Sequence, residues 1–256
     1  MVNKTKGFIA CLLLIFGTCQ FIGAQTANSS DGDTPPKEKT KNATTINGKK
    51  VEIFRDRLVL DVFHAFWLGM PKQDVNGVAI NNKKFNPGFS LSAMWDFKLP
   101  NDGPIKFGLG LGVSYYAHYT NARFIHGSMP DRVMNYEVPA VPDSTIKMLK
   151  MNYVNCYIPL EFRYRHQNGF KLTLGVRVGL VAEVSESYKG KDDQLNNIHQ
   201  KTYDIFNKQK YNFDVYTRIG WKFVNVFYSF QINKLFVKDK GPQICPMSVG
   251  ISLSIF

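Results

Sequence analysis

The chain has 256 residues, which allows one large domain or two small ones. Its 32 Lys and Arg residues outnumber its 20 Asp and Glu residues and give a formal net charge of +12. Because these cations are scattered among acidic residues rather than clustered, the sequence predicts no nucleic-acid partner and favours attraction to an anionic surface, such as lipid headgroups or lipopolysaccharide.

The first 24 residues have the features of a targeting segment rather than of a folded domain. Lys4 and Lys6 give a positive start, a mostly apolar stretch follows, and Gly23-Ala24 supplies the small residues of a cleavage site. Residues 1–24 are therefore predicted to be a cleaved signal peptide, and cleavage would lower the formal charge to +10. A lipid-anchored N-terminus at Cys19 is the alternative, which the residues before it disfavour.

Residues 25–50 are polar and charged and contain almost no large apolar side chains. Such a segment cannot bury a core, so the sequence predicts a disordered polar leader here. The folded domain is expected over residues 51–256.

From about residue 57 onward the chain alternates apolar and polar residues. Between Ile105 and Tyr119 every second residue is apolar or aromatic, while the other face carries Lys106 and several glycines; the segment 170–184 repeats this plan. A period of two indicates strands, since helices repeat near 3.6 residues. The pattern predicts eight strands, at about 57–68, 86–98, 104–119, 151–165, 170–184, 211–223, 225–236 and 245–256.

The connections between these strands alternate in length. Residues 99–103, residues 166–169 and the Val224-Asn225 junction are tight turns, and the long segments 69–85, 120–150 and 185–210 lie between them. Short turns at one end and long loops at the other are typical of outer-membrane barrels. The sequence therefore predicts an all-β fold, an eight-stranded antiparallel up-and-down transmembrane β-barrel in the outer membrane of a Gram-negative bacterium.

Alternation alone does not decide which face points outward, because a soluble lipocalin-like barrel holds its apolar face inside. Two features favour an outer face in lipid. The polar face is rich in glycine, which suits a narrow interior, and aromatic residues of the apolar face gather near the strand ends, as in the girdles at membrane interfaces. The interface aromatics predicted in this way include Trp95, Phe97, Tyr115, Tyr119, Trp221 and Phe223. The last residue, Phe256, falls in the polar register of its strand.

Charged residues on the polar face are predicted to fill the lumen. The set is Asp61, Asp96, Glu161, Arg163, Arg177, Glu183, Asp214, Arg218 and Lys222. An eight-stranded barrel is just wide enough for side chains to fill it, and an unpaired buried charge costs several kcal/mol. A plug of ion pairs, for instance Glu161 with Arg177 and Asp214 with Arg218, is therefore favoured over a narrow ion pathway.

No motif for a metal, a cofactor or a nucleotide is found. The alternating glycines after Phe107 lie within one strand and lack the helix that a dinucleotide site needs. Enzymatic barrels place a His with a Ser or an acidic residue near the outer rim, and His118 with Ser114, or His126 with Ser128 and Asp131, could be arranged so. Most rim histidines are structural, so the sequence predicts no enzyme. Cys156 and Cys245, on well-separated strands, are expected to be free thiols.

Two stretches resemble the PorT-like outer-membrane β-barrel proteins of Bacteroidetes. The segment from Asn155 to Tyr164, with Ile158-Pro159-Leu160 at its centre, is similar to the Ile-Pro-Leu strand of that family, and the last third of the chain, from Phe213 to Gly250, is similar to its final strands. The resemblance implies an eight-stranded outer-membrane barrel. It also implies a link to protein secretion, which is the role of the family's named member.

Two hypotheses for function follow. The first is a non-enzymatic accessory or structural subunit of an outer-membrane machine for secretion or barrel assembly, in contact with other outer-membrane subunits. The second is a ligand-binding or adhesion barrel acting through its extracellular loops; a lipid-modifying enzyme and a narrow pore are weaker alternatives. The long loops carry apolar residues that would pack on each other or on a partner, namely Phe124, Ile125, Met129, Val133, Met134, Leu195, Ile198, Ile205 and Phe206.

Overall fold

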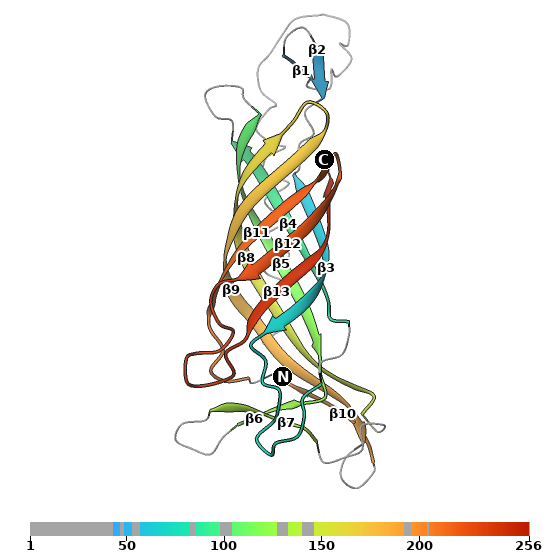
Figure 1. The fold of residues 1–256 in the computed structure, drawn as a ribbon, viewed down its shortest axis with the longest axis vertical. Helices are drawn as coiled ribbons and strands as arrows, with labels where there is room; N and C mark the ends of the chain where they lie inside the picture. The colour runs from blue at the N-terminus through green and yellow to red at the C-terminus, as the bar shows by residue number, and fades with distance from the viewer. Residues whose placement is uncertain are drawn as a thin grey trace, which may run out of the picture.

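A computed structural model describes residues 43–46, 49–52, 57–81, 85–97, 104–126, 133–139, 146–191, 196–203 and 205–255. Eight antiparallel strands form a tall closed barrel (Figure 1), and they confirm the predicted fold. They are β3 (Leu58–Leu68), β4 (Pro87–Phe97), β5 (Ile105–Tyr119), β8 (Met148–Arg165), β9 (Phe170–Lys191), β11 (Tyr211–Trp221), β12 (Val224–Gln231) and β13 (Cys245–Ile255). The last strand closes the ring on the first, with Ile255 opposite Leu58.

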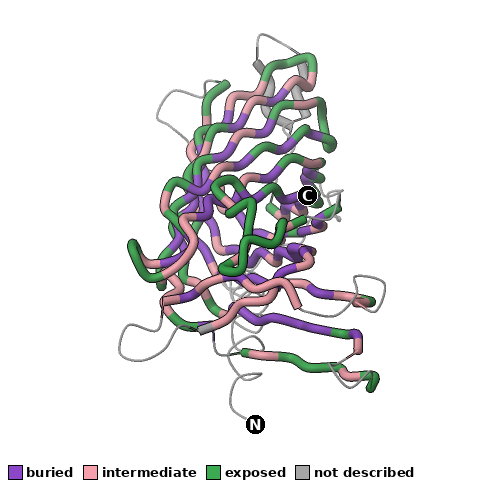
Figure 2. Tube along the Cα trace, turned by 60° about the horizontal axis from the view of Figure 1, so that its bottom comes forward, coloured by how far each residue is buried: buried purple, intermediate pink, exposed green. Residues whose placement is uncertain are grey.

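The barrel is apolar outside and polar inside. On β9, Leu174 and Leu180 are each 55% exposed, whereas Thr173 and Arg177 on the alternate face are buried. Figure 2 shows this alternation of exposed and buried residues along the strands. An exposed apolar wall around a polar interior is the arrangement of a transmembrane barrel and the reverse of a lipocalin, whose apolar face lines the interior.

The two ends of the barrel differ as the sequence predicts. Short turns, such as the one at residues 166–169, close one end, and both the start of β3 and the end of β13 lie at that end. The opposite end carries the long loops with three further strands (Figure 1): β6 (Arg123–His126) pairs with β7 (Met134–Glu137), and β10 (Asn197–Thr202) pairs with the extension of β9. Short turns face the periplasm in bacterial barrels and long loops face outward.

A β-bulge interrupts the pairing of β8 with β9 and corrects one prediction. Val154 lies opposite Glu183 and Asn155 lies opposite Val181, so Ala182 has no opposite residue. An extra residue reverses the side-chain direction beyond it. Val184 therefore packs in the buried core, and Glu183, predicted to lie in the lumen, faces outward.

A hairpin precedes the barrel in the chain. Strand β1 (Ala43–Ile46) pairs with β2 (Lys49–Glu52), and most of this pair lies within the last residues of the predicted disordered leader, 25–50. The sequence between the two strands is Asn47-Gly48, a strong short-range hairpin signal. The predicted signal peptide, the rest of the predicted leader and Phe256 lie outside the described residues.

Within the described ranges, no helix is long and apolar enough to cross a membrane.

Candidate functional site

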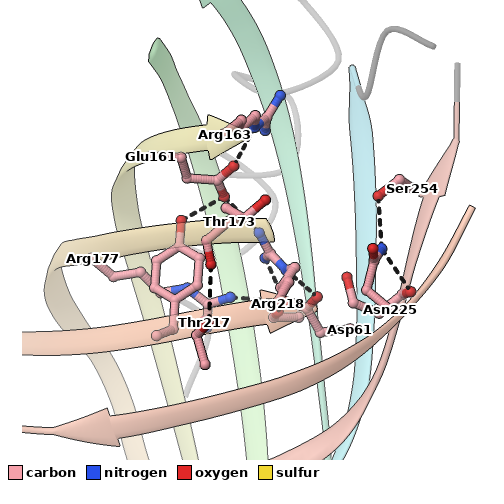
Figure 3. Close-up of polar contacts among 12 residues, drawn as sticks. Asp61, Glu161, Arg163, Thr173, Arg177, Thr217, Arg218, Asn225 and Ser254 are labelled. Atoms are coloured by element: carbon pink, nitrogen blue, oxygen red, sulfur yellow. Dashed lines mark hydrogen bonds and ion pairs between the residues drawn. The ribbon is translucent and has the colours of Figure 1, made fainter. Parts of the chain in front are cut away.

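The centre of the lumen is built on the carboxylate of Asp61 on β3 (Figure 3). Arg177 on β9 donates from Nη2 to Oδ2 at 2.7 Å. Arg218 on β11 donates from Nε to Oδ1 at 3.0 Å and from Nη2 to Oδ2 at 2.9 Å, a two-point contact. The hydroxyl of Ser90 on β4 donates to Oδ2 at 2.6 Å. Because Asp61 and Arg177 are each 0% exposed in their side chains, this contact lies away from solvent.

A second carboxylate, Glu161 on β8, extends the network toward the short-turn end. It accepts hydrogen bonds from Arg218 Nη1 at 2.6 Å and from Arg163 Nε at 2.5 Å. The hydroxyl of Tyr216 donates to the same carboxylate at 2.5 Å. Arg163 then bonds Asp96 on β4. Charged side chains from β3, β4, β8, β9 and β11 are thus tied into one continuous network across the lumen.

Aromatic rings enclose the two central guanidinium groups. The Arg177 Cζ atom lies 4.6 Å from the Tyr157 ring centroid, 4.4 Å from that of Tyr216 and 5.0 Å from that of Phe227. Arg218 lies 4.8 Å from the Tyr216 ring centroid. Cation–π contacts favour the charged guanidinium where water is excluded. The rings therefore stabilise the network and fill the space that water would otherwise occupy.

The structure places most of the predicted lumen charges on the inner wall but pairs them differently. The residues found there are Asp61, Asp96, Glu161, Arg163, Arg177, Asp214 and Arg218. Glu161 binds Arg163 and Arg218, not Arg177. Asp214 accepts a hydrogen bond from Asn212 at 3.1 Å, whereas Arg218 forms its ion pair with Asp61. Strand alternation predicts which face a charge occupies, but not which strand across the barrel supplies its partner.

Two predicted lumen charges lie elsewhere. Strand β11 ends at Trp221, so Lys222 sits exposed in the following turn with a φ of 51°. Glu183 faces outward because of the bulge, with an Oε1 to Lys201 Nζ distance of 4.0 Å.

The predicted interface aromatics all lie on the outward face, near the barrel ends. Phe97, Trp221 and Phe223 are each about half exposed near the short-turn end. Trp95, Tyr115 and Tyr119 are partly buried among their neighbours, and Trp95 and Tyr115 pack beside the small outward cluster around Val113.

Above the ion network, toward the long loops, the lumen is filled with apolar and aromatic side chains. Residues from the wall, such as Tyr153 and Phe227, pack with residues from the loops, such as Met134, Ile205 and Phe236. We call this packed group of loop residues the cap, and it covers lumen residues such as Tyr153 at the long-loop end. Of the apolar loop residues in the sequence, Met134 and Ile205 lie in this core and Phe124 packs against it, whereas Phe206 is 40% exposed. Met129 and Leu195 lie outside the described residues.

The histidine considered for catalysis is part of this packing. His118 is 1% exposed, and its ring stacks on Trp67 with centroids 4.0 Å apart and planes 7° apart. Ser114 is buried on the same inner face. Of the second set, His126 ends β6, while Ser128 and Asp131 lie outside the described residues.

Partly buried and exposed polar contacts hold the cap. Glu186 on the β9 extension accepts from the backbone N–H of Phe124 at 2.7 Å and from Arg123 Nε at 3.2 Å, which fixes β6 to the wall. Asp74 in the loop after β3 accepts from the N–H groups of Asn76, Val78 and Val138 at 2.8–2.9 Å. These bonds, that of Val138 foremost, hold the pKa of the Asp74 carboxyl below its ordinary value.

A cleft of about 360 Å³ opens between the cap loops. It is lined by Pro71, Gln73, Asp74, Val75, Val133, Met134, Asn135, Tyr136, Asp239, Gly241, Pro242 and Gln243. In the described part of the chain, no three His, Cys, Asp or Glu side chains are grouped to hold a metal ion. Both Cys156, on the wall, and Cys245, which is buried, are free thiols.

Comparison with solved structures gives several similar chains. Neisserial surface protein A is 14% identical, with 77% of this chain and 96% of that chain covered and a TM-score of 0.34. Ail, the attachment invasion locus protein of Yersinia pestis, is 12% identical, with 77% and 95% covered and a TM-score of 0.37. The outer membrane protease OmpT of Escherichia coli is 13% identical, with 69% and 66% covered and a TM-score of 0.34.

No model of a known protein family matches the chain, and no curated protein matches it. Membership of the PorT-like family therefore stays a prediction. The strand pairing, the apolar wall, and the asymmetry of short turns and long loops make this chain a transmembrane β-barrel of the outer-membrane type.

Replacing Asp61 by Asn should destabilise the barrel strongly. The substitution keeps the shape of the side chain but leaves Arg177 and Arg218 with one fewer counter-charge in a dry site, which costs about 3–5 kcal/mol. Urea unfolding in detergent micelles, followed by tryptophan fluorescence, measures the loss. Asp96→Asn is the matched control, because the Asp96 side chain is 18% exposed and should tolerate the change better. Equal losses in the two variants would contradict the central role of Asp61.

The cap contact of Asp74 should depend on pH. Because the pKa of Asp74 is lowered by folding, its stabilising contribution is complete above the ordinary pKa of an Asp carboxyl, about 4, and is lost as the pH falls through the lower folded value. An NMR titration of the Val138 amide shift in micelles should give a midpoint below about 4. The Asp74→Asn variant should show no such titration, and a midpoint at or above the ordinary value would disprove the contact.

Proposed function

We propose that the chain is a non-enzymatic integral barrel of the outer membrane of a Gram-negative bacterium, and that it serves as an accessory or structural subunit of a larger machine for secretion or barrel assembly. One observation supports the proposal: ion pairs between Asp61, Arg218 and Glu161, and buried apolar side chains on the long-loop side, fill the described lumen. A barrel with a filled interior can act only through its outer wall and its two ends.

Further features support this role. The candidate catalytic ring of His118 is packed against Trp67 rather than presented at an open site. The resemblance to PorT-like proteins points toward secretion, and the exposed apolar wall is available to other membrane subunits as well as to lipid. Outer-membrane lipid, lipopolysaccharide and neighbouring outer-membrane proteins are thus the proposed partners.

A second candidate function is ligand binding or adhesion at the outer surface. The observation that favours it is the cleft between the cap loops, where Asp74, Tyr136 and Asp239 line a space of about 360 Å³. Host-matrix binding by whole cells, before and after surface protease treatment, discriminates between the two functions. Binding that disappears with the cap loops would favour the adhesion role.

The subunit role predicts a stable partner. When the tagged full-length chain is extracted in mild detergent, at least one other outer-membrane protein should co-purify in constant ratio. A tagged barrel of unrelated sequence, expressed at the same level, controls for non-specific capture. Recovery of the chain alone, at the mass of a monomer in its micelle, would contradict the proposal.

The closed lumen predicts no conductance. In planar-bilayer recordings the reconstituted chain should show no stable open level, because ion pairs and aromatic rings occupy the cross-section where a path would run. A porin reconstituted in parallel verifies the assay. A steady channel from folded protein would overturn the plug and favour a pore.

A further inference from the structure

The outer wall carries a group of basic residues where β5, β8, β9 and β10 approach the long loops. One row of outward residues crosses these four strands in register, in the order Tyr119, Lys150, Ser187 and Lys201. The neighbouring outward row contains Lys189, which lies opposite Met148 of β8 and His199 of β10. We name Lys150, Lys189, His199 and Lys201 the basic patch.

The bulge at Ala182 brings Lys189 of β9 to the face of this patch. Before the bulge, the outward residues of β9 are Leu174, Val176, Val178 and Leu180, all exposed and apolar. After it, Ser185, Ser187 and Lys189 face outward, while Glu186 and Tyr188 turn inward to hold the cap. Without the inserted residue, an acidic and an aromatic side chain would occupy the outer face instead.

A ladder of hydrogen bonds marks the border between the apolar wall and the basic patch. The hydroxyl of Tyr115 donates to Asn152 Oδ1 at 2.7 Å, and Asn152 Nδ2 donates to the hydroxyls of Ser185 at 3.5 Å and Ser187 at 3.4 Å. On the apolar side of this ladder, Ile158 is 47% exposed. The change from apolar to hydrogen-bonding groups, with Tyr at the border, indicates the level of the lipid headgroups.

Among the described residues, the basic patch carries more positive than negative charge on that face. Glu183 is the one acidic residue of the described chain that shares this stretch of wall, at 4.0 Å from Lys201. Like charges on neighbouring positions of a sheet destabilise it. Lys150 and Lys201 lie over the rings of Tyr119 and Tyr203, at 5.8 and 4.5 Å, which holds both ammonium groups close to the wall. An external anion at headgroup level would relieve the repulsion.

We propose that the basic patch binds the phosphate groups of a phosphorylated glycolipid of the lipid A type in the outer leaflet. This rests on the outer-membrane location proposed above but not on the subunit role. Long loops face outward in such barrels, so the patch lies in the outer leaflet. Lys150, Lys189 and Lys201 supply charge, Ser187 lies between two of these lysines, and the acyl chains lie along Ile158 and the leucines of β9.

The test measures lipid binding by the purified full-length chain, with native mass spectrometry in detergent. The probes are bisphosphorylated lipid A and the same lipid A after enzymatic dephosphorylation. The triple variant Lys150→Gln, Lys189→Gln, Lys201→Gln should lose affinity for the phosphorylated form by about 100-fold, since each lysine near an anionic surface contributes roughly fivefold. Dephosphorylation should weaken binding to the natural chain to a similar extent.

The matched control removes three exposed cap lysines elsewhere, Lys72, Lys234 and Lys238, with the same change in net charge. It should bind phosphorylated lipid A almost as the natural chain does, and a mobility shift between boiled and unboiled samples verifies that both variants fold. Three results would overturn the proposal: unchanged binding by the patch variant, an equal loss in the control, or equal binding of dephosphorylated lipid. Loss of a co-purifying protein with unchanged lipid binding would make the patch a protein interface instead.

Discussion

The structure depends on how one buried carboxylate, that of Asp61, is satisfied. An eight-stranded barrel leaves room for side chains but not for a hydrated pathway, so each charge on the inner wall needs a partner from another strand. Asp61 forms ion pairs with two arginines, Arg177 on β9 and Arg218 on β11, and Arg218 also forms an ion pair with Glu161. This cross-barrel bonding connects strands that do not pair with each other, and its side chains fill the lumen at that level.

Closure of the interior moves the question of function to the surface. The described parts of the loops fold back and bury Met134, Ile205 and Phe236 over the barrel mouth, so this part of the cap is packed. The surfaces that remain are the lipid-facing wall, the cleft in the cap, and the basic patch at the headgroup level. A closed scaffold with such surfaces suits a subunit that is positioned by lipid and by neighbouring proteins.

Much of this was predictable from the period-two pattern, which gives the strands, the outward face and the positions of most lumen charges. The pattern does not reveal an inserted residue such as Ala182, because the residues on both sides of the bulge continue to alternate. It therefore predicts the inner face for Glu183, whose side chain faces outward. It also does not reveal partners across the barrel, which depend on strand tilt and side-chain reach, so Arg218 was paired with the wrong carboxylate. Lys222 was misplaced because strand ends are set by turns rather than by alternation.

The most direct test of the cross-barrel ion network is a double-mutant cycle between Asp61 and Arg218. The free energies of unfolding of Asp61→Asn, Arg218→Gln and the double variant, measured in the same micelles, give the coupling of the two residues. A shared network predicts that the double variant loses less stability than the sum of the single variants, by about 1.5 kcal/mol or more. Additive losses, within about 0.5 kcal/mol, would show that the two side chains act independently and would contradict the account.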